Sequence, residues 1–161
     1  MSKQIVIEPE KCISCRTCML VCSFKHFNKF APALSAVSVF EYEKDVITVP
    51  IMCLQCDQAL CSKVCPTGAL SHNSIGVMSY NYDKCITCKL CLQACPLGCI
   101  TYSPVEQKVF KCDFCDGDPE CVKHCAAGAL TYEDPADDND RIAAVALNLK
   151  KATEATFEEV A

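Results

Sequence analysis

The stretch Cys12-Ile13-Ser14-Cys15-Arg16-Thr17-Cys18-Met19-Leu20-Val21-Cys22 decides the fold of this chain. It carries four cysteines in the order C-x2-C-x2-C-x3-C, and three further cysteine quartets follow along the 161 residues. The later quartets are Cys53, Cys56, Cys61 and Cys65; Cys85, Cys88, Cys91 and Cys95; and Cys112, Cys115, Cys121 and Cys125. Every quartet closes with the same C-x3-C step, so the sequence repeats one kind of site four times.

This spacing is typical of thiolate ligands to iron–sulfur clusters. The first and third quartets have the full C-x2-C-x2-C-x3-C run, in which the fourth cysteine often binds the neighbouring cluster. A proline follows the last cysteine of the second and third quartets, as Cys65-Pro66 and Cys95-Pro96. We therefore predict that the cofactors are four [4Fe–4S] clusters and that all sixteen quartet cysteines are metal ligands.

Disulfides and structural zinc are the alternatives to iron–sulfur clusters. Disulfide frameworks belong to short secreted domains, and the N-terminus has neither an apolar signal segment nor a twin-arginine pair. We accordingly expect a cytoplasmic location. Zinc sites usually join two C-x2-C steps across a longer spacer, whereas each quartet here is compact. Both alternatives are therefore less favoured than clusters, and zinc would make the chain an interaction module.

An internal repeat organises the sequence. The first quartet matches the third, and the looser second quartet matches the fourth, which gives the order A-B-A′-B′. We predict one domain over residues 1–132, with a duplication of 4–80 and 81–132 and an insertion at 23–52. The seventeenth cysteine, Cys99, aligns with Ala69 and Ala129, so we expect it to be a small buried residue and not a ligand.

Short elements are expected around the quartets. Each C-x3-C step should begin a short helix that ends near Gly68, Gly98 or Gly128 and is followed by a brief strand. Hairpins are predicted from Gly76 to Tyr82 and from Ile100 to Phe110. In the insertion, residues 36–42 and 46–49 alternate like another hairpin, which Pro50 should end.

The tail has a different pattern. An acidic linker begins at residue 133, and apolar residues then recur at helical spacing between Ile142 and Val160, with Asn139 or Asp140 as the N-cap. We predict an amphipathic helix within residues 133–161. It would pack on its own chain or dock onto another subunit.

The charge of the chain excludes some functions. The net charge is −5, and each oxidised cluster would add about −2, which argues against nucleic acid as a partner. Basic residues stand in or beside the quartets, either to compensate this charge or as an ordinary solvated surface. They are Lys11, Arg16, Lys63, Lys84, Lys89, Lys111 and Lys123.

Catalytic motifs are missing from the sequence. None of the three histidines lies in an acid–base or nucleophilic motif, and there is no nucleotide-binding glycine loop. His124 could donate a hydrogen bond to its neighbouring cluster or simply face solvent. Phe24, His26, Phe27 and Phe30 would shield a cluster or fill ordinary core. No apolar run reaches eighteen residues, so we expect no catalysis by this chain and no direct membrane insertion.

The order of the quartets over residues 4–132 resembles the four-cluster, ferredoxin-like electron-transfer subunits. These accompany molybdenum and tungsten oxidoreductases, formate dehydrogenases, hydrogenases and carbon monoxide dehydrogenase. Residues 22–30, Pro32 and Ser35 are most similar to the small iron–sulfur subunit of tungsten-dependent aldehyde oxidoreductases. Ala126 departs from the proline that the family often has after the last cysteine, but the ligand itself is present.

The resemblance implies an α+β fold of two interleaved dicluster-ferredoxin-like units with short helices and hairpins, followed by the C-terminal helix. It also implies that quartets one and four, and quartets two and three, exchange their fourth cysteines. The implied ligand sets are Cys12, Cys15, Cys18 and Cys125; Cys112, Cys115, Cys121 and Cys22; Cys53, Cys56, Cys61 and Cys95; and Cys85, Cys88, Cys91 and Cys65.

The function implied is that of a non-catalytic relay for single electrons. Its partner would be a larger catalytic subunit, most similar to a tungstopterin-containing aldehyde oxidoreductase, with a flavin protein or ferredoxin as a further partner. A subunit of a hydrogenase, formate dehydrogenase or carbon monoxide dehydrogenase, and a free polyferredoxin, remain the alternatives. Self-association into oligomers or filaments is compatible with a chain that exposes clusters at two ends.

Overall fold

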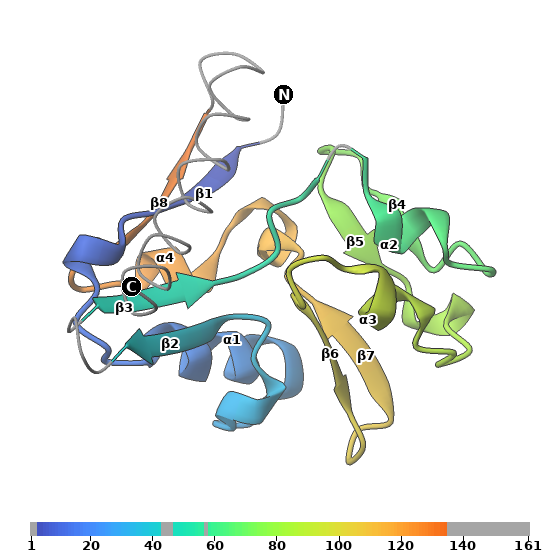
Figure 1. Ribbon diagram of the computed structural model, residues 1–161, viewed down its shortest axis with the longest axis horizontal. Coiled ribbons are helices and arrows are strands. Elements are labelled where there is room, and N and C mark those ends of the chain that lie inside the picture. The colour runs from blue at the N-terminus through green and yellow to red at the C-terminus, as the bar shows by residue number, and fades with distance from the viewer. Residues whose placement is uncertain (1–2, 43–46, 57, 135–161) are drawn as a thin grey trace, which may run out of the picture.

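The computed structural model describes residues 3–42, 47–56 and 58–134. Short helices and strands form two lobes side by side, and Figure 1 shows the first on the left and the second on the right. The first lobe contains β1 (Gln4–Ile7), α1 (Thr17–Phe27), β2 (Ser38–Tyr42), β3 (Ile47–Ile51), α4 (Glu120–Lys123) and β8 (Leu130–Glu133). The second contains α2 (Leu60–Lys63), β4 (Leu70–His72), β5 (Met78–Tyr80), α3 (Leu90–Ala94), β6 (Ile100–Ser103) and β7 (Lys108–Lys111). Four 3-10 turns complete the described elements: η1 (Pro9–Lys11), η2 (Pro32–Leu34), η3 (Tyr82–Lys84) and η4 (Phe114–Gly117).

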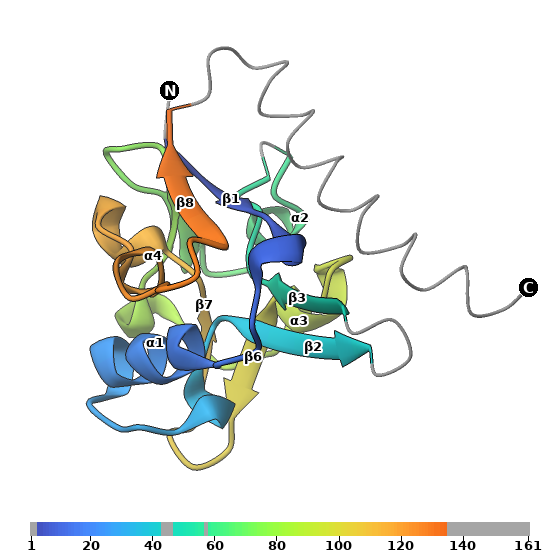
Figure 2. The ribbon, with the colours of Figure 1, turned by 90° about the vertical axis from the view of Figure 1, so that its left-hand side faces the viewer.

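The first lobe joins the two ends of the described chain. Strands β1 and β8 pair antiparallel, with Gln4 opposite Glu133 and Ile7 opposite Leu130. Helices α1 and α4 lie side by side below this pair in Figure 2 and are in contact. The first and fourth quartets therefore meet in one lobe, although ninety residues of sequence separate them.

The second lobe is formed by the middle of the chain. Strands β4 and β5 form one hairpin, and β6 and β7 form another with Ile100 opposite Lys111. The hairpin predicted between Ile100 and Phe110 is thus confirmed. The hairpin predicted within Gly76 to Tyr82 was wrong. The strand in this stretch, β5, pairs with β4 at Leu70, and the chain enters η3 at Tyr82.

The insertion forms the predicted hairpin of β2 and β3. Pro50 does not end it, contrary to expectation, but lies inside β3 opposite Val39. A proline is tolerated there because this sheet has only two strands, and an edge strand has a side whose N–H groups need no partner in the sheet.

The helices at the second, third and fourth C-x3-C steps are shorter than predicted, whereas α1 continues past Cys22. They end at Lys63, Ala94 and Lys123, before the fourth cysteine of each step. Gly68, Gly98 and Gly128 come later, in left-handed turns at φ +63°, +62° and +66°. Each glycine N–H donates to the carbonyl of the fourth cysteine, at 3.3, 3.2 and 3.0 Å respectively. The turn at this cysteine stops the helix and places the next strand.

Each lobe has a small core. The first is built around Ile5, Leu34, Val37, Phe114 and Leu130, together with buried quartet cysteines. Among the described residues, the fully buried part of the second comprises Ala59, Leu70, Met78, Cys91, Ile100 and Val109. Since so few apolar side chains are buried, bound metal would add substantially to the stability of the second lobe.

The mixture of helices and antiparallel strand pairs confirms the α+β class. Among the described residues, no helix has the length and apolar character needed to cross a membrane. The predicted C-terminal helix and its N-cap lie outside the described residues.

Candidate metal centres

The loops that carry the cysteines have a strained backbone. Ser14 and Arg16 in the first quartet, and Thr87 and Lys89 in the third, have φ between +56° and +62°. Such left-handed residues cost about 1–3 kcal/mol each and persist where surrounding structure or a ligand enforces them. The conformation also turns successive backbone N–H groups into one concavity, an arrangement found around iron–sulfur sites. The loops are therefore shaped to surround an anionic group.

Three hollows in the structure are each lined by four quartet cysteines. In every case three of them come from one quartet and the fourth comes from its partner quartet. The groups are Cys12, Cys15, Cys18 and Cys125; Cys53, Cys56, Cys61 and Cys95; and Cys65, Cys85, Cys88 and Cys91. In these three hollows, Cys125 and Cys95 lie with cysteines of the partner quartet and not with the three cysteines that precede them in sequence.

The remaining four cysteines gather in the core of the first lobe. Burial raises the pKa of Cys112 well above its ordinary value, and Cys53, Cys121 and Cys22 raise it further. Burial likewise raises the pKa of Cys121 to about 12, with Cys22 and Cys115 adding to the shift. Cys22, Cys112 and Cys121 belong to one buried cluster, and Cys22 also raises the pKa of Cys115. These four thiols are the most deeply buried of the four groups.

Helix geometry explains why neighbouring cysteines serve different groups. In α1, Cys18 and Cys22 are four residues apart, which places them one above the other on the same helix face. One turn of helix therefore presents them to two adjacent sites. Cys121 and Cys125 likewise belong to different groups, because Cys121 lies in α4 and Cys125 lies in the turn after it.

The distances between donors argue against single metal ions in these groups. Four thiolates around one zinc ion stand about 3.8 Å apart, since each Zn–S bond is about 2.3 Å. Among the described residues, the one group of three or more donors within 4.8 Å of one another is His26, Asp113 and Cys115. It contains a single cysteine. Among the described residues, the thiol groups are therefore not close enough to surround a single zinc ion as they stand.

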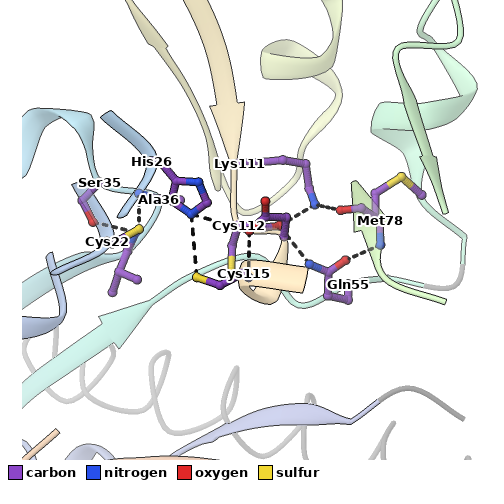
Figure 3. Close-up of polar contacts among 11 residues, drawn as sticks. Cys22, His26, Ser35, Ala36, Gln55, Met78, Lys111, Cys112 and Cys115 are labelled. Atoms are coloured by element: carbon purple, nitrogen blue, oxygen red, sulfur yellow. Dashed lines mark hydrogen bonds and ion pairs between the residues drawn. The ribbon is translucent and has the colours of Figure 1, made fainter. Parts of the chain in front are cut away.

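Several quartet sulfurs accept hydrogen bonds from backbone N–H groups. Backbone N–H groups donate to Cys22 from Ala36 at 3.4 Å, to Cys65 from Ala69 at 3.3 Å, and to Cys85 from Thr87 at 3.3 Å. Figure 3 shows the first of these contacts, with Ser35 beside it. Such donors stabilise negative charge on sulfur and thereby favour the reduced state of a bound cluster.

Burial makes the inner thiols hard to ionise. It raises the pKa of Cys18, Cys91 and Cys115 to about 11. In contrast, a hydrogen bond with Thr17 lowers the pKa of Cys15, which is exposed. Metal binding must displace the protons of the buried thiols, so ligation and folding are coupled at these positions.

The basic residues beside the quartets differ in exposure and in their partners. Arg16 pairs with Glu41 at 3.0 Å, Lys89 lies 3.8 Å from the centre of the Tyr102 ring, and Lys123 binds Glu120 at 3.2 Å. All three are exposed. Lys111 is the exception, because its side chain is buried between the lobes.

His26 contacts a quartet thiol, whereas His124 lines the hollow of Cys12, Cys15, Cys18 and Cys125. His124 Nδ1 is 3.0 Å from the carbonyl oxygen of Glu120, whereas His26 Nε2 lies 3.8 Å from Cys115 Sγ and 3.6 Å from Asp113 Oδ1. The aromatic residues in and after α1 also have different surroundings. Phe27 packs edge-to-face on Phe110, but Phe24 and Phe30 stack on each other at the surface.

Sequence reasoning missed two buried polar residues at the centres. Gln55 lies between two cysteines of the second quartet and reaches across to Cys112. The Tyr80 hydroxyl is buried at the hollow lined by Cys85, and this thiol is its hydrogen-bonding neighbour. Burial raises the pKa of Tyr80, and the neighbouring Cys85 raises it further. Neither residue has a motif that would reveal it, because each acts through a contact distant in sequence.

Cys99 is buried, as predicted. Its thiol donates to the carbonyl of Met52 at 3.3 Å, and burial raises its pKa to about 12. It borders the hollow lined by Cys53 but occupies the position of an alanine in the other copies.

Thiol groups of this number and spacing, on short helices and hairpins, define an iron–sulfur protein. A family model described as "4Fe-4S dicluster domain" matches residues 44–135, and a second with the same description matches residues 11–70. The chain belongs to the 4Fe-4S dicluster domain family. The resemblance found in the sequence is thereby confirmed at the level of the family.

Several curated relatives are similar over about half of this chain. The polyferredoxin-like subunit of aliphatic sulfonate oxidoreductase from Pyrococcus furiosus is 42% identical over 85 residues, covering 52% of this chain and 49% of the relative. The iron-sulfur subunit of arsenate respiratory reductase from a Shewanella species is 33% identical over 89 residues, which is 53% of this chain and 38% of the relative. Electron transport protein HydN from Escherichia coli is 31% identical over 94 residues, with 55% and 53% covered.

The chain spans about half, or less, of the length of these relatives. Their names are those of electron-transport proteins or of subunits of oxidoreductases, which agrees with the predicted non-catalytic role. The solved active site complex BamBC of benzoyl coenzyme A reductase with benzoyl-CoA aligns over 97% of this chain and 96% of that chain at 25% identity. Its TM-score of 0.49 is too low to establish a common fold.

Proposed function

We propose that this chain is an electron-transfer subunit that relays single electrons between a catalytic metal-cofactor subunit and another redox partner. The observation that carries the proposal is the gathering of thiols from paired quartets into common hollows. A [4Fe–4S] cluster, when bound, accepts and releases one electron at a potential that its surroundings set.

The residues that would hold four such clusters are the four thiol groups. Set 1 is Cys12, Cys15, Cys18 and Cys125; set 2 is Cys22, Cys112, Cys115 and Cys121; set 3 is Cys53, Cys56, Cys61 and Cys95; and set 4 is Cys65, Cys85, Cys88 and Cys91. The hollows, the mutual effects of the thiols on their pKa values and the strained loops support this assignment. Its chemistry fits, because four thiolates are the usual ligands of such a cluster.

Two ends of the molecule are suited to electron exchange with partners. Sets 1, 3 and 4 each contain an exposed cysteine, Cys15, Cys56 and Cys88 respectively. In sets 1 and 4 an exposed apolar residue also stands two positions before this cysteine, where Ile13 is 68% exposed and Ile86 is 63% exposed. Exposed apolar side chains beside a redox site are suited to close contact with another protein.

For the catalytic partner we propose a tungstopterin-containing subunit of the aldehyde oxidoreductase type, because of the similarity noted at residues 22–30. A hydrogenase, a formate or carbon monoxide dehydrogenase, and a free polyferredoxin remain alternatives, and a flavin protein or ferredoxin would be the other partner. The names of the relatives support a subunit of an oxidoreductase. The cytoplasmic location stays a prediction that cell fractionation can test.

Anaerobic isolation followed by iron and acid-labile sulfide analysis tests the cofactor. We expect about sixteen iron atoms per chain, four for each cluster. A pulldown from the native source with native mass spectrometry then distinguishes a complex from a free carrier, and would also show oligomers. Zinc in place of iron would contradict the proposal.

A pair of cysteine variants tests the relay. Cys53→Ser removes a proposed ligand and should cut turnover with the physiological acceptor, whereas Cys99→Ser changes a thiol beside the same hollow that is not a proposed ligand. Turnover that is undiminished in Cys53→Ser, or equally lowered in both, would argue against the relay.

A further inference from the structure

A buried lysine stands where the two lobes meet. Lys111 is the last residue of β7, directly before Cys112, and only 4% of it is exposed. It is the one charged side chain among the buried residues that the structure describes. Lysine is almost never buried to this degree without dedicated partners, because its charge loses hydration.

Its partners hold the ammonium in one place. Lys111 Nζ donates to the carbonyl oxygens of Met78 and Cys112, both at 2.6 Å. Gln55 connects the same two residues, since its amide accepts from the Met78 N–H and donates to the Cys112 carbonyl, both at 2.9 Å. Figure 3 shows the resulting closed ring of hydrogen bonds. Both acceptors of the lysine are neutral carbonyls, so neither cancels its charge.

The ammonium lies between two of the proposed ligand sets. Lys111 lines the hollow of set 3, and one of its carbonyl partners belongs to Cys112 of set 2. The ammonium therefore borders set 3 of the second lobe while it is hydrogen-bonded to the backbone of a proposed ligand residue of the first lobe.

We propose that Lys111 sets the reduction potentials at this junction, making sets 2 and 3 easier to reduce than they would be without its charge. The inference rests on the proposed function. Reduction adds a negative charge, and a fixed positive charge nearby stabilises that state most where water does not screen it. Arg16 and Lys89, the basic neighbours of sets 1 and 4, are exposed and screened by solvent. An electron would thus be held more firmly at sets 2 and 3 than at sets 1 and 4.

Redox titration of the purified chain, followed by EPR, tests the inference. In Lys111→Met the charge is lost and the apolar stem is kept. At a fixed ambient potential, we expect the ratio of reduced to oxidised cluster to fall at least tenfold for one or two of the four clusters, which is about 59 mV for one electron. Lys111→Arg should keep the parent potentials, because it keeps the charge.

A matched control lies on the same strand. Lys108 begins β7 and is exposed, with its Nζ 5.0 Å from the centre of the Tyr82 ring. Lys108→Met removes the same charge from the chain, so it should change every ratio less than twofold. Equal shifts in Lys111→Met and Lys108→Met, with iron fully loaded, would overturn the inference.

Iron analysis separates the possible failures. If Lys111→Met does not load iron, Lys111→Gln, which keeps an N–H donor without the charge, is titrated in its place. Failure of both neutral variants to load iron would overturn the inference in favour of a structural role. A parent chain without iron would overturn the proposed function as well, whereas a loaded variant with unshifted potentials overturns only the role of Lys111.

Discussion

Gln55 is predicted to fasten the two lobes together. It is 1% exposed, and it is the residue whose side chain connects a backbone N–H of β5 with the carbonyl of Cys112. Gln55→Met keeps the length of the side chain but removes both hydrogen bonds. Lys111 still donates to the Cys112 carbonyl, so the Met78 N–H is the backbone group left without a partner. One such buried group costs about 1–3 kcal/mol, which we expect to be lost from the free energy of unfolding. An ordinary domain has about 5–15 kcal/mol in total.

Hydrogen exchange can localise this effect in the iron-loaded protein. The Met78 amide should exchange about fivefold faster or more in Gln55→Met, because a loss of about 1–3 kcal/mol is converted at about 1.4 kcal/mol for each factor of ten. Guanidinium unfolding, followed by cluster absorbance, should shift to lower denaturant. Gln58→Met is the control, since Gln58 is exposed and binds Lys63 at the surface. It should change stability by less than about 0.5 kcal/mol. Equal stability of the two variants, or an unchanged Met78 amide, would refute the reasoning.

Three further outcomes are expected. Cys125→Ser should lower the iron content by about four atoms per chain, and its EPR spectrum should match that of Cys12→Ser; a match to Cys112→Ser would instead support uncrossed ligation. Burial raises the pKa of Cys99 to about 12, so at pH 8 only about one thiol in ten thousand is ionised. Its alkylation by iodoacetamide, followed by mass spectrometry, should rise tenfold per pH unit, and rapid labelling at pH 8 would show that it is not buried. Tyr80→Phe removes a hydroxyl beside set 4 and should lower one cluster potential, because a donor to sulfur favours the reduced form; an unchanged EPR titration would exclude that hydrogen bond.

Local features of the fold were predictable because they depend on short stretches of sequence. The hairpin from Ile100 and the position of Cys99 follow from strand alternation and from the repeat. The helix ends were not predictable to the residue. They depend on the turn that each fourth cysteine makes, in which a glycine N–H bonds its carbonyl. The place of Pro50 was missed because its tolerance depends on β3 being an edge strand.

The contacts at the centres were harder to predict because they join distant parts of the chain. Seven basic residues stand near the quartets in the sequence, and nothing in the sequence distinguishes Lys111 from the other six. Its burial arises from the meeting of β7 with β5 and with the loop of Gln55. His26 stands out in the sequence only as part of an aromatic segment, and its approach to Cys115 depends on α1 packing against the fourth quartet.

The sequence by itself determined the class of cofactor and predicted cysteines as its ligands, because cysteine spacing is a local property that does not depend on how the lobes are arranged. From the residues alone it left open which fourth cysteine joins which group, and only the resemblance implied an exchange. The tertiary structure decided which thiols share a hollow and which charge is buried between the lobes. The physical reason is that one helical turn presents successive cysteines to two sites, and long-range pairing such as that of β1 with β8 determines what each site contains.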